Sequence, residues 1–295
     1  MTDAAIADSR ERIYAGMLIT ALSYLLFSMQ DASIKLLVTG LSVWQILFFR
    51  SAAILAGCAA IGGRSVFAEA YRSKAFYPML LRSFIILGAW LCFYNAAKHL
   101  QLAELTTIYF AAPVIVTILS IFVLGEQVPL VRWVAVLTGF VGVFVACDPT
   151  SLGLSMPVIM VLAAACLWAF AIVLIRKIAL YERTMVQMVL NNALFLVVAG
   201  LPLFYLWKTP SWDEWLLLTV LAIVGGLGQY ALFEGMKRAP ASVVAPFEYT
   251  ALVWAFVFGF AIWGDIPRRE VFIGAALIFL AGLVIIAGEH FRRRA

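Results

Sequence analysis

The amino-acid sequence predicts an all-α membrane protein of ten transmembrane helices, arranged as two inverted five-helix repeats. Three observations lead to this fold class. The 295-residue chain is 65% hydrophobic and only 13% charged, whereas an average soluble domain has about 25% charged residues. Apolar stretches long enough to cross a bilayer as helices, about 20 residues each, fill almost the whole chain. The second half of the chain also echoes the first.

The ten predicted spans follow one another with short connections, so no soluble domain is expected. A basic segment precedes the first span, but its apolar run is much longer than the roughly 7–15 residues of a signal peptide, so we predict a membrane helix there. The expected spans are residues 13–37, 43–61, 76–97, 103–124, 131–147, 156–178, 185–207, 213–236, 241–263 and 269–290.

The internal repeat rests on three matches that occur in the same order at an offset of about 140 residues. We therefore predict a first repeat over residues 13–147 and a second over residues 156–290. Because five is an odd number, the second repeat should enter the membrane upside down relative to the first. The matching segments are 21–35 with 163–177, 124–126 with 263–265, and Gly142 with Gly282.

The distribution of charge predicts the orientation of the chain in the membrane. With both termini in the cytoplasm, most of the 21 Lys and Arg residues fall on the cytoplasmic side, as the positive-inside rule requires. We therefore predict a multi-pass protein of the inner (plasma) membrane. The net charge of +5 is spread over the loops, so it does not predict nucleic-acid binding. A monomer is compatible with the sequence, which leaves the oligomeric state open.

The sequence holds no constellation typical of an enzyme. It has only two histidines, His99 and His290, and no HExxH, GxSxG or Walker motif. None of the four cysteines has CxxC spacing. We therefore expect no enzymatic activity, no cofactor and no metal site.

Charged residues inside predicted spans are costly in a bilayer and indicate a functional or structural partner. Asp31 and Arg50 lie at similar depth in the first two spans, which predicts a buried ion pair. Asp31 has an alternative partner in Lys35, one helical turn away. Arg82 is expected to extend to the interface. Glu248 is expected either to hold a proton or to pair with Arg82.

Aromatic and polar residues near mid-span predict a small-molecule site between the two halves. Trp90 and Tyr94 are four residues apart and so share a helix face, as do Gly225 and Gln229. An apolar, aromatic cavity with few polar groups is typical of such sites; the alternative is that these rings only pack between helices. The candidate lining is Tyr24, Trp90, Tyr94, Tyr109, Trp168, Gln229, Glu248, Tyr249 and Trp254.

Helix-weakening residues inside the spans are candidate hinges. Pro113 and Pro246 lie in equivalent spans of the two repeats, and Gly225 with Gly226 loosens the eighth span. Proline removes a backbone hydrogen bond and kinks a helix. The alternative is that a static bundle merely tolerates them.

Two segments carry a resemblance to a known family: AKHLQLAELTTIYFAAPVIVTILSIFVLGEQV from Ala97 and MKRAPASVVAPFEYTALVWAFVFGFAIWGD from Met236. Together they resemble the paired signature of the drug/metabolite transporter (DMT) superfamily, EamA type. One departure is Asp265, which stands where the first repeat has Glu126. The resemblance implies ten helices, two EamA repeats, and secondary transport of small organic metabolites.

Amino-acid exporters of the YddG type are one branch of this family, whereas the segments FSMQDASIK and WQILFFR are similar to carriers that take up S-adenosylmethionine. The predicted function is therefore transport by alternating access, with export of an aromatic or neutral amino acid as the first expectation. A carrier for a cationic metabolite such as S-adenosylmethionine is the alternative. A non-transporting membrane scaffold is the alternative of a different class.

Overall fold

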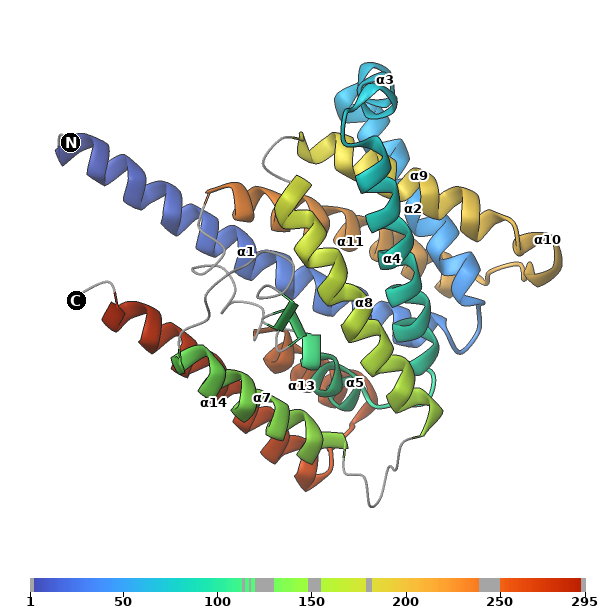
Figure 1. The fold of residues 1–295 in the computed structure, drawn as a ribbon. Coiled ribbons are helices and arrows are strands. Elements are labelled where there is room, and N and C mark those ends of the chain that lie inside the picture. The colour runs from blue at the N-terminus through green and yellow to red at the C-terminus, as the bar shows by residue number, and fades with distance from the viewer. Residues whose placement is uncertain are drawn as a thin grey trace.

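The computed structural model describes residues 3–112, 115–116, 118–119, 130–147, 155–178, 182–238 and 250–292, and all regular secondary structure within them is helical (Figure 1). The helices are α1 (Asp3–Leu37), α2 (Val43–Gly62), α3 (Ser65–Arg72), α4 (Phe76–Ala96), α5 (Leu102–Tyr109), α7 (Leu130–Cys147), α8 (Met156–Ile178), α9 (Thr184–Gly200), α10 (Leu203–Leu206), α11 (Trp212–Arg238), α13 (Thr250–Trp263) and α14 (Arg269–Arg292).

Local sequence sets several of the helix boundaries. Ser42 caps α2, because its hydroxyl accepts a hydrogen bond from the backbone N–H of Gln45 at 3.2 Å. The same helix stops at Gly63, whose φ of 63° is left-handed and suits a residue without a Cβ. Gly264 has a φ of 66° and ends α13 in the same way. These positive-φ glycines let the chain turn directly after an apolar helix.

The helices differ from the predicted spans in three ways. α1 begins at Asp3, ten residues before the apolar stretch, as a continuous helix. The connection after α2 was expected to be a loop but contains α3, which buries Val66 and Ala70 and exposes its polar face. The predicted span 185–207 ends at Gly200, because a turn and the short α10 follow it.

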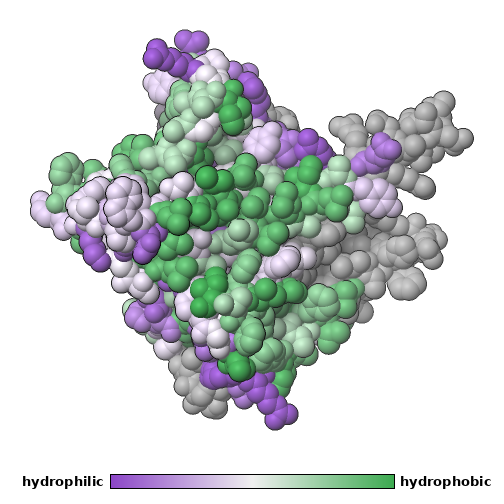
Figure 2. Space-filling model, turned by 180° about the vertical axis from the view of Figure 1, so that it is seen from behind, coloured by the Kyte–Doolittle hydropathy of each residue, from purple (hydrophilic) through white to green (hydrophobic). Residues whose placement is uncertain are grey.

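Membrane crossing is supported by the length and apolarity of the helices. Within the described residues, four segments are long and apolar enough to cross a bilayer: Tyr14–Leu37, Val43–Gly62, Phe76–Ala96 and Trp212–Gly235. Four shorter apolar helical segments accompany them. Figure 2 shows apolar residues over the middle of one face, with hydrophilic residues gathered mainly at its margins. The protein is therefore a multi-pass membrane protein, while the count of ten spans stays a prediction.

The two halves of the chain pack against each other in a regular pattern of helix pairs. α1 packs on α11, and α4 packs on α8; α2 packs on α9, α5 on α13, and α7 on α14. Each pair joins one helix from before residue 147 with one from after residue 156. If each helix is replaced by its equivalent in the other half, the α1–α11 pair becomes the α4–α8 pair. The other three pairs are unchanged, so the two halves use the same pattern of contacts.

Small residues permit the closest of these approaches. In the α7–α14 pair, which lies side by side in Figure 1, a Cβ added at Gly142 would lie 2.7 Å from the carbonyl oxygen of Gly274. Only residues without a bulky side chain allow such backbone contact between membrane helices. Gly142 and Gly274 therefore permit the close approach of α7 and α14.

Candidate functional site

A buried cavity of about 40 Å³ lies where helices of both halves meet. The first half contributes α1, α2 and α4, and the second contributes α8, α9 and α11. Its lining combines two arginines, two tryptophans and two carboxamides with apolar side chains. The lining residues are Phe27, Arg50, Arg82, Ile86, Trp90, Trp168, Asn191, Gln229, Leu232 and Phe233.

Arg50 of α2 is completely buried, at 0% exposure. Its Nε donates a hydrogen bond to the Oε1 of Gln30 at 3.0 Å, and its guanidinium carbon lies 4.2 Å from the ring centre of Trp90. Such a cation–π contact is worth about 2 kcal/mol when it is desolvated. Both terminal nitrogens, Nη1 and Nη2, have no hydrogen-bond partner among the described residues.

Gly225 of α11 creates the room for this arrangement. A Cβ at position 225 would lie 2.8 Å from the Nε of Arg50 and would come still closer to the Oε1 of Gln30. α11 is one helix from Trp212 to Arg238 and runs through Gly225 and Gly226. The glycine at 225 thus has a packing role, while the proposed hinge at these two residues stays a prediction.

Arg82 of α4 is the second buried arginine, at 1% exposure. Its Nη1 donates a hydrogen bond to the Oε1 of Gln187 at 2.7 Å, and its Nε has no partner. The Nε2 of Gln187 in turn donates to the backbone carbonyl of Glu182 at 3.2 Å. The expectation that Arg82 extends to the interface is wrong, because Gln187 supplies a partner inside the protein.

Aromatic rings pack around Trp90 on one side of the cavity. Trp90 stacks on Tyr94 with ring centres 5.7 Å apart and meets Phe195 edge-on at 5.3 Å. Trp90 is therefore held between Arg50 and these two rings. The hydroxyl of Tyr94 is buried and has no hydrogen-bond partner in the described part of the chain. Trp168 reaches the cavity from α8, in the other half of the chain.

Carboxamides from α9 and α11 complete the polar part of the lining. The Nδ2 of Asn192 donates to the carbonyl of Met188 at 2.8 Å and lies 3.5 Å from the Oε1 of Gln229. The Oδ1 atoms of Asn191 and Asn192 have no partner. The cavity therefore offers acceptors as well as donors, and no carboxylate belongs to its described lining.

The site and hinge residues predicted from the sequence fall into three groups. Trp90, Trp168 and Gln229 line the cavity, and Tyr94 supports Trp90 from behind. The remaining described candidates pack elsewhere: Tyr24 beside Phe27, Tyr109 against Phe93, and Trp254 against Phe258. Four predicted residues lie outside the described part of the chain: Pro113, Pro246, Glu248 and Tyr249.

Among the described contacts, no nitrogen–oxygen distance of 4.0 Å or less joins Asp31 to Arg50. The two side chains are close enough to interact through their charges, so the predicted pair is not a direct salt bridge. Gln30 takes the place of Asp31 beside Arg50. Successive residues of a helix point about 100° apart, so Gln30 makes the direct hydrogen bond to Arg50 and Asp31 acts on it only through its charge. The alternative partner of Asp31, Lys35, instead pairs with Asp265 at 3.2 Å.

The sequence analysis did not place Arg82 or Asn191 in the cavity lining, where the structure has both. The depth of Arg82, about six residues into its span, was compatible with an interfacial position. Its hydrogen-bond partner, Gln187, lies near the start of α9. Without the packing of α4 on α9, that partner is invisible in the sequence.

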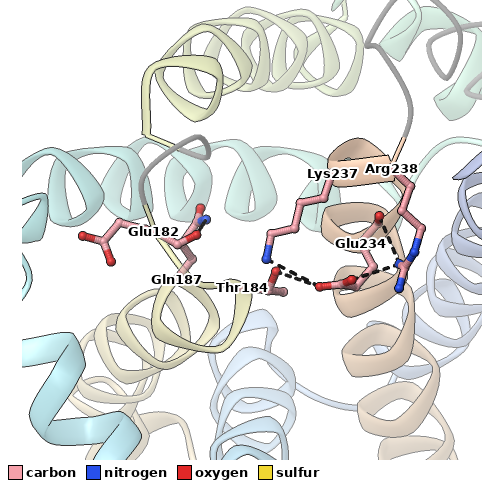
Figure 3. A network of polar contacts seen from close by, with 6 residues as sticks. All are labelled: Glu182, Thr184, Gln187, Glu234, Lys237 and Arg238. Carbon is pink, nitrogen blue, oxygen red and sulfur yellow. Dashed lines mark hydrogen bonds and ion pairs between the residues drawn. The ribbon is translucent and has the colours of Figure 1, made fainter. Parts of the chain in front are cut away.

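A hydrogen bond between Thr184 and Glu234 joins the beginning of α9 to the end of α11, outside the cavity lining. Figure 3 shows Lys237 and Arg238 turning back toward Glu234 of their own helix, with Thr184 of α9 facing the same carboxylate. The Arg238–Glu234 distance is 2.9 Å and the Lys237–Glu234 distance is 3.5 Å. Glu234 is therefore paired within its own helix, and this carboxylate is satisfied outside the cavity.

A larger hollow of about 550 Å³ lies between α3 and the beginning of α9. Its charged groups include Glu69 and Arg183, which form an ion pair at 2.7 Å and are both exposed. Because these groups satisfy each other in contact with solvent, the hollow lacks the unpartnered buried donors of the central cavity.

A bundle of apolar helices that encloses a polar and aromatic cavity between two similarly arranged halves defines a membrane carrier. The chain belongs to the EamA-like transporter family, whose pattern matches residues 14–147 and again residues 155–287. The protein is therefore a transporter of the drug/metabolite transporter superfamily and not an enzyme.

Relatives with assigned names differ in cargo. The chain is 27% identical over 272 residues to the S-adenosylmethionine uptake transporter of Rickettsia prowazekii (strain Madrid E), covering 91% of each chain. It is also 27% identical to the riboflavin transporter of Vibrio cholerae, covering 77% of this chain and 76% of the relative. The pseudopaline exporter of Pseudomonas aeruginosa is 27% identical, with 92% and 95% coverage.

A solved crystal structure shares the fold, with a TM-score of 0.62 at 18% sequence identity, covering 94% of this chain and 96% of that chain. This likeness concerns the fold, and the family membership makes the protein a multi-pass transporter in a lipid bilayer that handles a small molecule. The named relatives do not share a cargo, so the substrate has to be argued from the cavity.

Proposed function

We propose that the protein moves a small organic solute across the inner membrane by alternating access, with the buried cavity as its binding site. The observation that carries this proposal is the composition of the cavity. Its charged, amide and aromatic side chains come from equivalent helices of both halves. Rocking of one half against the other would open such a site to each side in turn.

The two halves are proposed to be residues 13–147 and 156–290, inverted relative to each other. The helix pairing that survives exchange of the halves supports this division. The size of the cavity supports an occluded conformation. One water needs about 10–15 Å³ of such space, so 40 Å³ holds about three waters and no complete amino acid. The halves must therefore separate before a whole solute enters.

The proposed cargo is an aromatic or neutral amino acid, moved outward. Trp90 and Trp168 supply flat apolar surfaces from opposite halves, and Arg50, Asn191 and Gln229 supply polar groups for the charged ends of the solute. S-adenosylmethionine, moved inward, is the second candidate, favoured by the coverage and identity of the Rickettsia relative. The two arginines and the absence of a carboxylate from the described lining count against a purely cationic cargo.

Counterflow in liposomes tests this proposal. The purified protein would be reconstituted into liposomes loaded with unlabelled solute. Uptake of labelled phenylalanine, alanine or S-adenosylmethionine into these liposomes would then be measured. Trp90→Ala and Trp168→Ala should reduce transport of the bulky amino acid more than that of the small one. Trp212→Ala is the matched control, because Trp212 is 90% exposed. Exchange of no solute at all would contradict the carrier function.

A further inference from the structure

Two guanidinium groups inside the molecule have donors that the described protein does not use. Arg50 has free Nη1 and Nη2 atoms, and Arg82 has a free Nε. Both side chains line the same cavity and are 0% and 1% exposed. A buried donor without an acceptor is unfavourable, and an intramembrane charge without a partner more so. The arrangement therefore calls for an acceptor that occupies the cavity.

The described carboxylates near the cavity do not fill this role. Glu234 is held by Lys237 and Arg238, and Asp31 acts on Arg50 through its charge but, among the described contacts, accepts no hydrogen bond from it. Glu182 accepts a hydrogen bond from Ser73. The described lining of the cavity thus contains arginine donors to which no described residue supplies an acceptor.

We infer that Arg50 and Arg82 form a subsite for the carboxylate group of the transported solute. This inference rests on the proposed carrier function and names the class of cargo: organic acids with an apolar or aromatic body, amino acids included. The two free terminal nitrogens of Arg50 lie in one plane and match the two oxygens of a carboxylate. Gln30 and Trp90 fix that plane from the third nitrogen and from one face.

The rest of the cavity fits the remainder of such a solute. Trp168, Leu232 and Phe233 offer apolar surface, and the amides of Asn191 and Gln229 offer both donors and acceptors. The 40 Å³ now open correspond to about three waters, which is the scale of a carboxylate group. The subsite is therefore formed in this conformation, while the space for the body of the solute opens with the halves.

The test compares solutes that differ only in the carboxylate. Thermal unfolding of the purified wild-type protein would be measured with L-phenylalanine, L-phenylalaninamide, 3-phenylpropanoate and phenethylamine, and with S-adenosylmethionine and its decarboxylated form. The acid form of a pair should bind at least about tenfold more tightly than its neutral or decarboxylated form. Binding of 3-phenylpropanoate distinguishes recognition of any carboxylate from recognition of an amino acid.

Variants identify the residues responsible. Arg50→Lys keeps the charge but loses the planar fork, and Arg82→Gln removes the charge; each should reduce the preference for the acid form about tenfold or more. Arg183→Gln is the control, because the Arg183 side chain is 68% exposed, and it should leave the preference unchanged. Glu248→Gln tests the rival explanation. If Glu248 is the counter-ion of Arg82, this change should increase acid binding and destabilise the unliganded protein.

The outcomes separate the two proposals. Equal binding of acid and amide forms to the wild type would overturn the carboxylate subsite while leaving the carrier function standing, and this comparison does not depend on any variant folding. Unchanged preference in both arginine variants would also overturn it. Exchange of no solute in counterflow would instead contradict the carrier function itself.

Discussion

At the scale of single residues, the site depends on which neighbour of a helix faces inward. Gln30 and Asp31 are adjacent, yet it is the uncharged Gln30 that meets Arg50. The consequence is that Arg50 keeps free donors, which a carboxylate at 3 Å would have consumed. Gln30 therefore orients the guanidinium and leaves its two terminal nitrogens available, which suits a group that binds an anion.

This geometry predicts how neutral substitutions combine. Gln30→Ala and Arg50→Gln should be strongly coupled in transport and stability, by about 0.5–3 kcal/mol, because the two side chains touch. Asp31→Asn and Arg50→Gln should be closer to additive. A double-mutant cycle on thermal unfolding and counterflow measures both couplings. A larger coupling for Asp31 than for Gln30 would contradict the observed pairing.

Gly225→Ala is predicted to disturb the same contact from α11. The added Cβ falls 2.8 Å from the Nε of Arg50, so the unfolding free energy should drop by about 1–3 kcal/mol and transport should fall. Gly57→Ala in α2 is the control, since nothing lies within 4 Å of its Cβ position. If the two variants unfold alike, the close approach at position 225 is not limiting.

At the scale of helices, the ends of α1 and α13 are tied across the two halves. The Nζ of Lys35 lies 3.2 Å from the Oδ2 of Asp265 and 4.6 Å from the ring centre of Trp263. The Nε of Arg268 lies 3.1 Å from the Oε1 of Glu104 in α5. Both contacts join residues more than 160 positions apart, so they hold one end of the bundle together.

Breaking the Lys35–Asp265 contact should favour opening at that end. A contact present in one state only biases the two populations by its own free energy; about 1 kcal/mol for this pair is about a fivefold shift. Lys35→Gln should therefore raise the labelling rate of a cysteine at the cavity residue Leu232, introduced into a cysteine-free background. The charge exchange Lys35→Asp with Asp265→Lys should restore slow labelling. No change in labelling would show that this contact does not control access.

At the scale of the whole molecule, the orientation in the membrane follows from the loop charges. Both termini are predicted to be cytoplasmic, which places residues 148–156, a segment without Lys or Arg, on the outside. A cysteine at Ser151, in a background lacking native cysteines, should react with an impermeant thiol reagent added to intact cells. Reaction only after lysis would reverse the assignment.

The sequence by itself determined the fold class, because apolar length and scarcity of charge reflect the bilayer as solvent. It also indicated Trp90, Trp168 and Gln229 from their depth along single helices. Only the tertiary structure decided which side chains meet: Arg50 with Gln30, and Arg82 with Gln187. These contacts depend on how each packed helix is rotated about its own axis, because successive side chains of a helix point about 100° apart. The hydropathy of the sequence predicts the depth of a residue in the membrane, but it does not predict the rotation of each helix.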